Sequence, residues 1–113
     1  MISSTLTQEI TYLHANLCSA LADPTRLLLL YALSDQPRNV TELTQELNVL
    51  QPSVSRHLRV LRDGGLVRTT RQGSSVLYEL TDRRVIEALD LLRGVLRDRI
   101  QRSADLIDEL VAS

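Results

Sequence analysis

Residues 51–80 read QPSVSRHLRVLRDGGLVRTTRQGSSVLYEL, a stretch that predicts a polar helix followed by a β-hairpin. On a helical wheel the first part has an apolar stripe about 40° wide, formed by Val54, Leu58 and Leu61. Arg56 and Arg59 point to the opposite side, together with an acidic residue near the end of the helix. A helix of this kind packs its apolar stripe on a core and leaves its cations in solvent.

The residues after this helix predict a hairpin, or wing, over about residues 66–80. Gly64 and Gly65 end the helix, and LVRTTR and VLYEL are β-prone runs separated by QGSS. The tip needs a residue with positive φ, which Gly73 supplies. The core-facing side chains of the hairpin are expected to be Val76, Tyr78 and Leu80.

Two shorter helices are predicted before residue 51. Asp23 is a suitable N-cap for a helix that starts at Pro24, and LLLLYAL makes that helix nearly all apolar, as the centre of a core would be. Thr41 is a suitable cap for a helix through Leu47, which Asn48 would end in a left-handed conformation.

The next helix would begin three residues later, with Gln51 as its cap and Pro52 at its first position. A short helix, a tight turn and a second helix with a basic outer face form a helix-turn-helix, expected at about residues 41–63.

Long amphipathic helices are predicted at both ends, at about residues 5–22 and 82–112, the second of them capped by Thr81. Their apolar residues recur near a 3.5-residue period: Leu6, Ile10, Leu13, Leu17 and Ala20 in the first, and Ile86, Leu89, Leu96, Ile100, Ile107 and Leu110 in the second. The second helix would be about 45 Å long, more than a domain of this size covers with its own surface. We therefore expect a homodimer built from the two terminal helices.

The whole pattern predicts a mainly α single domain over residues 1–113 with a β-hairpin wing, in the order α-α-α-α-β-β-α. This is the order of a winged helix-turn-helix. The chain has 113 residues and a net charge of -1, yet residues 51–75 carry five arginines against Asp63 alone. Basic charge is therefore concentrated where the helix-turn-helix meets the wing.

Several classes of protein are disfavoured by composition. No apolar run is long enough to span a membrane and the N-terminus has no signal pattern, so a cytoplasmic location is expected. There is no nucleophile paired with a base at a recognisable spacing, no phosphate loop and no metal-binding cluster, so an enzyme is not expected. With three Tyr and no Phe or Trp, the chain is poorly equipped to stack on single-stranded nucleic acid.

Two segments, LADPTRLLLLYAL and SVSRHLRVLRDGGLVRTTRQGSSVLYEL, closely resemble the ArsR/SmtB-type (arsenic-repressor) family of bacterial transcription regulators. The resemblance covers about residues 15–82. It implies a dimeric repressor that leaves its operator when a metal ion, or another signal, binds or reacts.

The metal-sensing residues of that family are not matched. Where arsenic sensors carry Cys-X-Cys this chain has Asn39 and Thr41. Where zinc sensors carry Asp-X-His and a later His pair, counting from Asp82 gives Arg84, Val95 and Asp98. The thiolate and histidine sites typical of the family are therefore absent, no cofactor is predicted, and the inducer is not identified.

Residues for contact with double-stranded DNA are expected at the start of the basic helix and in the wing. Side chains near the N-terminus of a recognition helix reach base edges, which makes Gln51, Ser53, Ser55 and Arg56 the sequence-reading candidates. Arg59 is expected at a phosphate, and Arg62, nearer the apolar stripe, stays open. The candidates for phosphate contact from the wing are Arg68, Arg71, Gln72 and Ser74.

Two histidines and the one cysteine allow other interpretations. His57 lies at the edge of the apolar stripe and is expected to be a packed residue. His14 and Cys18 are four residues apart and could form a metal or thiol-redox sensor pair, completed by an acid of the partner chain: Asp105, Asp108 or Glu109. The favoured alternative is that Cys18 packs beside Leu17 and Leu21.

We conclude that the sequence predicts a homodimeric, sequence-specific DNA-binding transcriptional regulator that recognises a palindromic operator and acts, on the strength of the resemblance, as a repressor. The alternative is a winged-helix module for protein–protein interaction. Protein interfaces bury an aromatic or aliphatic anchor, and none is evident among the polar residues that open the basic helix.

Overall fold

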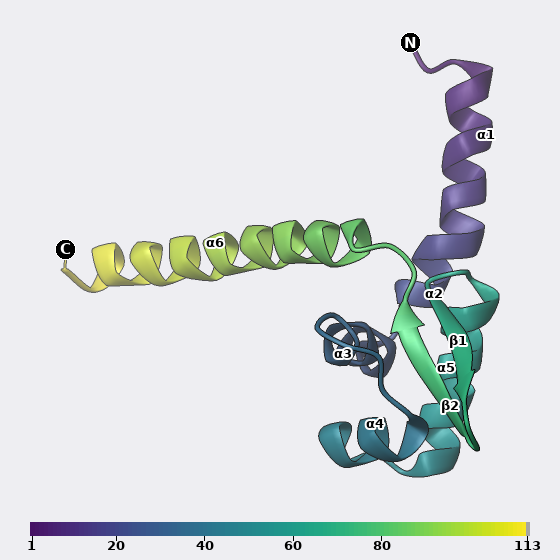
Figure 1. Cartoon of the computed structure of the whole chain (residues 1–113). Coiled ribbons are helices and arrows are strands. Elements are labelled where there is room, and N and C mark those ends of the chain that lie inside the picture. The colour runs from purple at the N-terminus through teal and green to yellow at the C-terminus, as the bar shows by residue number, and fades with distance from the viewer. Residues whose placement is uncertain (113) are drawn as a thin grey trace. The chain divides into compact units, whose positions relative to one another are not determined.

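The computed structural model describes residues 1–112 and has the predicted order of elements (Figure 1). The mainly helical architecture with a hairpin wing is thereby confirmed. The chain forms two compact units, Met1–Arg83 and a second that begins at Arg84. The elements are α1 (Ser4–Leu13), the π-helical turn η1 (His14–Cys18), α2 (Ser19–Leu21), α3 (Pro24–Ala32), α4 (Val40–Leu47), α5 (Gln51–Asp63), β1 (Val67–Gln72), β2 (Ser75–Leu80) and α6 (Arg84–Ala112).

The predicted N-terminal helix is continuous but contains a π-helical turn. Within it the N–H of Ser19 donates to the carbonyl of His14, five residues back, in place of the usual four. The hydroxyl of Ser19 donates to the carbonyl of Ala15 at 2.6 Å, so this carbonyl keeps a donor despite the changed register. None of the residues of α1 is buried, and α1 extends away from the other helices of the first unit (Figure 1).

Helix α3 begins where the sequence predicts. The carboxylate of Asp23 accepts hydrogen bonds from the N–H groups of Thr25 at 2.8 Å and Arg26 at 3.2 Å, which makes it the N-cap. Leu29 and Leu30 are fully buried and Leu33 nearly so. The core of the first unit is thus centred on α3, as expected from its apolar sequence.

The predicted cap of α4 is wrong. Asn39, not Thr41, caps the helix: its side chain accepts from the N–H of Glu42 at 2.8 Å, and the Glu42 carboxylate accepts from the N–H of Asn39 at 3.0 Å. This reciprocal capping box satisfies two free donors, whereas a cap at Thr41 would satisfy one. The predicted end is confirmed, since Asn48 has a φ of 54°.

The wing is an antiparallel hairpin in which Gln72 pairs with Ser75, leaving Gly73 and Ser74 as a two-residue turn. Gly73 has a φ of 64°, as predicted, while φ of Ser74 is not positive. Positive φ at the first turn position alone is the pattern of a type II′ turn. The expected alternation along β2 is not seen, because all residues from Val76 to Leu80 are half-buried.

Thr81 does not cap the last helix. Its hydroxyl donates to the carbonyl of Gly65 at 2.7 Å and its N–H to that of Leu66 at 3.1 Å, which fixes the end of the hairpin to the end of α5. With Thr81 engaged there, α6 starts at Arg84, two residues later than predicted.

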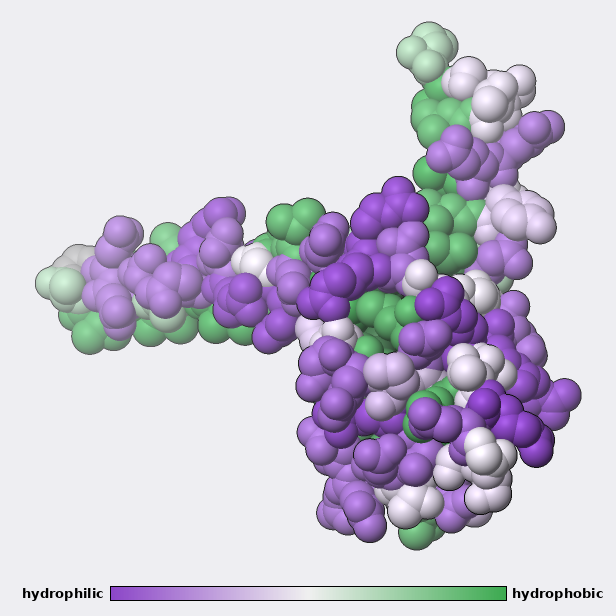
Figure 2. Space-filling view, viewed as in Figure 1, coloured by the Kyte–Doolittle hydropathy of each residue, from purple (hydrophilic) through white to green (hydrophobic). Residues whose placement is uncertain are grey.

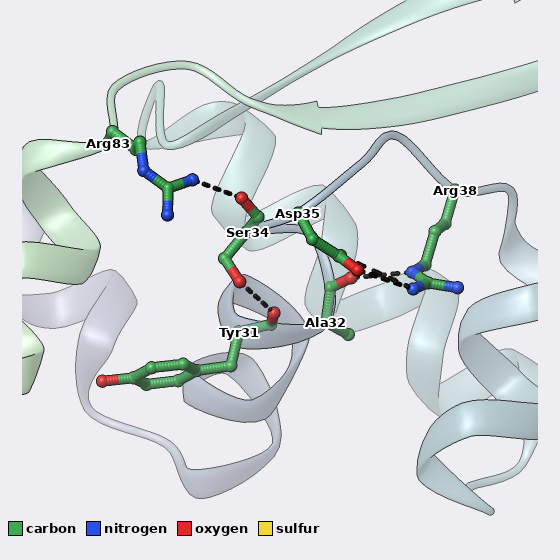
Figure 3. A network of polar contacts seen from close by, with 6 residues as sticks. All are labelled: Tyr31, Ala32, Ser34, Asp35, Arg38 and Arg83. Carbon is green, nitrogen blue, oxygen red and sulfur yellow. Dashed lines mark hydrogen bonds and ion pairs between the residues drawn. The ribbon is translucent and has the colours of Figure 1, made fainter.

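Polar contacts fix the loop between α3 and α4 against β2 and the residues after it, and Figure 3 shows those made by the side chains of Arg38 and Arg83. The backbones of Arg38 and Tyr78 exchange two hydrogen bonds of 3.0 and 2.8 Å. The Arg38 side chain donates to the carbonyl of Ala32 and pairs with Asp35, while Arg83 donates to the carbonyl of Ser34. The helix-turn-helix and the wing are thereby held in one unit.

The second unit consists of α6, in which Ile86 and Leu89 are buried and most of the other apolar residues are exposed in the single chain. Four of those predicted to form the stripe are more than half exposed: Leu96, Ile100, Ile107 and Leu110. None of the helices within residues 1–112 combines the length and the hydropathy needed to cross a membrane.

Gly64, the C-cap of α5, lies against the N-terminal helix. A Cβ atom at this position would be 3.0 Å from the carbonyl oxygen of Asn16 and 3.3 Å from the Cβ of Ala20. The φ of Gly64 is -79°, so the close contact rather than the backbone conformation makes glycine necessary here.

The contact predicts that Gly64→Ala lowers the free energy of unfolding by about 1–3 kcal/mol, because α5 and α2 must move apart. Gly94→Ala is the control: a Cβ there meets no atom within 4 Å, and alanine in a helix interior should raise stability by about 0.5–1 kcal/mol. Urea unfolding midpoints measure both changes. Equal stability of Gly64→Ala and the original chain would refute the proposed close contact.

Candidate nucleic-acid interface

The candidate surface is built on α5, whose start differs from the prediction by one residue. Leu50, not Gln51, is the N-cap: its ψ of 140° is extended, and its carbonyl accepts from the N–H groups of Ser53 at 3.0 Å and Val54 at 3.1 Å. No side chain caps this end. Gln51 is the first helical residue and Pro52, which has no N–H to leave unsatisfied, is the second.

The rotation of α5 about its axis is set by its apolar stripe. Val54, Leu58 and Leu61 are fully buried, as predicted from their spacing. The predicted contact residues lie on the remaining surface: Gln51, Ser55, Arg56 and Arg59 are exposed and Ser53 is half-buried. Burial of one face therefore presents the polar face to solvent as a connected surface.

The cations of α5 are free to bind an external anion. Arg56 and Arg59 make no hydrogen bond or ion pair with any described residue. Arg62, which the sequence left open, is exposed and equally without a partner in residues 1–112. Since none of these charges is neutralised by the fold, the helix carries a positive potential on its outer face.

The wing arginines differ from each other. Arg68 lies opposite Glu79 in the hairpin register, and its Nε is 2.6 Å from the Glu79 carboxylate. Arg71 is paired in register with Val76 and has no ionic partner among the described residues. Gln72 and Ser74 are exposed at the tip. Of the two arginines, Arg71 thus has the free charge.

A hydrogen-bond network around Arg26 holds α5 on the side away from the candidate surface. This network is not predicted from the sequence. The Arg26 guanidinium donates to the carbonyls of Ala20 at 2.6 Å and Ser19 at 3.1 Å, and its Nη1 is 3.3 Å from Nδ1 of His57. Because arginine only donates, Nδ1 of His57 is the acceptor. His57 is therefore a packed residue, as predicted, and it connects α5 to α2 and α3.

The same network lowers the pKa of Asp23. Partial burial alone would raise it, but hydrogen bonds from the N–H groups of Arg26 and Thr25, together with the electrostatic effect of the nearby His57 and Arg26 side chains, outweigh that effect. Nε2 of His57 is 3.9 Å from the Asp23 carboxylate. Asp23 thus caps α3 in its charged form.

His14 and Cys18 are the first and last residues of the π-helical turn. Cys18 is exposed, so its expected packing beside Leu17 and Leu21 is not found in the single chain. No group of three or more His, Cys, Asp and Glu side chains that could hold a metal ion occurs in the part of the chain that is described. The prediction that no cofactor is needed stays a prediction.

Leu50 is a second residue that sequence reasoning missed. Its side chain is 80% exposed beside the polar residues that open α5. A signal was available, since an aliphatic residue occupies an N-cap where Ser, Thr, Asp or Asn is favoured. With the cap expected at Gln51, Leu50 lies outside the predicted helix and has no expected role.

The chain matches the family model described as "Bacterial regulatory protein, arsR family" over residues 23–69. It is 43% identical over 76 residues to the HTH-type transcriptional regulator NmtR of Mycobacterium tuberculosis, covering 67% of this chain and 63% of NmtR, a little under two thirds. It is 36% identical over 78 residues to the biofilm growth-associated repressor of Xylella fastidiosa, covering 69% of this chain and 68% of that protein.

The fold is similar to that of the transcriptional repressor BigR from Xylella fastidiosa, with a TM-score of 0.70 and 30% identity over 83% of this chain and 96% of BigR. The matched family region contains α3, α4, α5 and the start of the wing, which are the elements that form the candidate surface.

The lowered pKa of Asp23 leads to a prediction on stability. A carboxyl group whose pKa is lower in the folded chain than its ordinary 3.8 stabilises the fold above pH 3.8, and this contribution is lost as the pH falls below 3.8 through the lowered pKa. Asp23→Asn keeps a capping oxygen but no charge, so it should be less stable than the original chain at pH 6.

The stability difference between the two proteins should shrink as the pH falls below 3.8, which urea unfolding at pH 6 and at pH 3 measures. Other carboxyl groups titrate in both proteins and cancel in the difference. A difference that does not change with pH would show that the charge of Asp23 contributes nothing.

Proposed function

This chain belongs to the arsR family of bacterial regulatory proteins, and on that premise we propose that it is a homodimeric, sequence-specific DNA-binding transcriptional repressor acting in the cytoplasm. The observation that carries the proposal is the outer face of α5, where polar side chains and unpaired arginines lie together at the start of the second helix of a helix-turn-helix. Such a face is suited to the edges and phosphates of duplex DNA.

In this proposal α5 lies in the major groove with its N-terminal residues toward the bases. Gln51, Ser53, Ser55 and Arg56 read base edges, with amide and guanidinium groups able to form paired hydrogen bonds to adenine and guanine. Arg59 binds a phosphate. In the wing, Arg71 together with Gln72 and Ser74 contacts the backbone beside the groove, while the pairing of Arg68 with Glu79 reduces its contribution.

Dimerisation through α1 and α6 is supported by the apolar side chains that each helix exposes (Figure 2). The exposed set in α6 comprises Leu91, Leu92, Val95, Leu96, Ile100, Leu106, Ile107, Leu110 and Val111, each at least 50% exposed. In α1 the corresponding residues are Leu6, Ile10, Tyr12 and Leu13. Apolar surface of this extent is typical of an interface, and a second copy of the same helices covers it symmetrically.

Repression would follow from occupation of a promoter, and release from a signal that changes the spacing of the two recognition helices. Such a signal must bind the free dimer more tightly than the DNA-bound dimer, by the factor by which it weakens DNA binding. Because the metal-ligand positions of arsenic and zinc sensors are occupied by residues such as Asn39, Thr41 and Val95, we do not assign a metal as the inducer.

The proposal is tested by selecting bound molecules from random duplex DNA at about 150 mM salt and sequencing them. A homodimer with one recognition helix per subunit should enrich an inverted repeat with half-sites about 10–11 base pairs apart. Weak, salt-sensitive binding without enrichment would contradict sequence-specific recognition and would favour the protein-interaction module.

The division of roles between helix and wing predicts different effects of three substitutions. Arg56→Ala should weaken binding to the selected site by about 1–3 kcal/mol and relax specificity at one base pair. Arg71→Ala should weaken binding to all sequences alike and lower the slope of log K against log salt by about one.

Arg68→Ala is the matched control within the wing. Its charge is already paired with Glu79, so it should change the salt slope less than Arg71→Ala does. Binding measured by fluorescence anisotropy at several salt concentrations gives all three values. Indistinguishable effects of Arg56→Ala and Arg71→Ala would contradict the assigned roles.

A further inference from the structure

Leu50 is an apolar side chain exposed at the start of the recognition helix. At 80% exposure it is the most exposed large hydrophobic residue between Ser3 and Arg83, followed by Tyr12 of α1 at 73% and Leu28 at 57%. Its neighbours in sequence toward the helix, Gln51 and Pro52, are exposed as well. The fold therefore gives this side chain no packing role in the single chain.

The same position would favour a polar residue if stability alone mattered. The N-cap side chain ordinarily accepts a hydrogen bond from a free N–H of the first turn, and Leu50 provides no such acceptor. Serine, threonine, asparagine and aspartate are all better N-caps than leucine. With leucine at this position the folded chain is therefore less stable than it would be with one of these capping residues.

We infer that Leu50 contacts the C5 methyl group of a thymine in each half-site and thereby adds to the specificity of the chain. This inference rests on the proposed function, in which the N-terminus of α5 faces base edges. The major groove presents one apolar group, the thymine methyl, and aliphatic side chains read it by contact. Leu50 is the aliphatic group adjacent to the polar base-reading residues.

The surroundings of Leu50 favour DNA over a protein partner. Apart from Pro52, the residues that share this end of α5 are polar, and Arg56 and Arg59 nearby carry unpaired charge. A protein-binding surface has several apolar residues in one patch with a charged rim. A single aliphatic side chain among polar groups does not form such a patch, but it is enough to contact one methyl group.

The experiment replaces each thymine of the selected operator in turn by deoxyuridine, which lacks only the C5 methyl group. In each half-site, one particular thymine should matter: replacing that thymine alone should make the original chain bind about threefold to fivefold more weakly. For Leu50→Ala this loss should vanish, so that the thymine and deoxyuridine operators bind alike. The matched control Leu28→Ala, which removes an exposed leucine of α3, should keep the full loss.

Leu50→Ser separates recognition from folding. It should also lose the discrimination between thymine and deoxyuridine, while its Tm rises by roughly 2–6 °C because the helix gains a capping hydroxyl. A variant that is more stable and yet less selective cannot have lost selectivity through unfolding.

Three results would overturn the inference. The first is an operator that is bound specifically but shows no loss at any thymine, and the second is a loss that persists in Leu50→Ala; the proposed function survives both. The third is the absence of any enriched operator, which removes the proposed function and the inference with it.

Discussion

The guanidinium of Arg26 is the interaction on which the arrangement of the recognition helix depends. One planar group satisfies two carbonyls at the end of α2 and the ring of His57 on α5, while the backbone of the same residue is held by the Asp23 cap of α3. Three helices therefore meet at one side chain. Lysine could not replace it, because a single ammonium group does not present several donors in a fixed plane.

From that anchor the DNA-facing surface results by geometry. His57 and the buried Val54, Leu58 and Leu61 fix the rotation of α5, so the other side of the helix is necessarily the one in solvent. The arginines on that side form no ion pair with any described residue, although the chain as a whole is slightly acidic. The local excess at α5 and the wing, rather than the net charge, determines what the protein can bind.

Much of this could be predicted from the sequence, because it rests on local rules. The stripe of α5, the cap at Asp23 and the positive φ at Asn48 and Gly73 each depend on a few neighbouring residues. The predicted cap of α4 is wrong because Asn39 and Thr41 are both suitable caps and lie two residues apart, and only Asn39 forms the capping box. The predicted cap of α5 is wrong because Leu50 has no capping side chain, so its residue type does not indicate the start of the helix. The pairing of Arg68 with Glu79 and the contact of Arg26 with His57 join residues that are far apart in the sequence, so no local sequence pattern predicts them.

The π-helical turn at His14–Cys18 has a consequence for how the N-terminal helix is phased. A turn closed over five residues instead of four contains one extra residue, which rotates the residues before the turn by about 100° relative to the residues after it. The direction in which Leu6, Ile10 and Leu13 face is thus decoupled from the direction in which the buried Ala20 faces. Because of this one extra residue, the apolar side chains before the turn and those after it face directions that a regular α-helix with the same sequence would not give them.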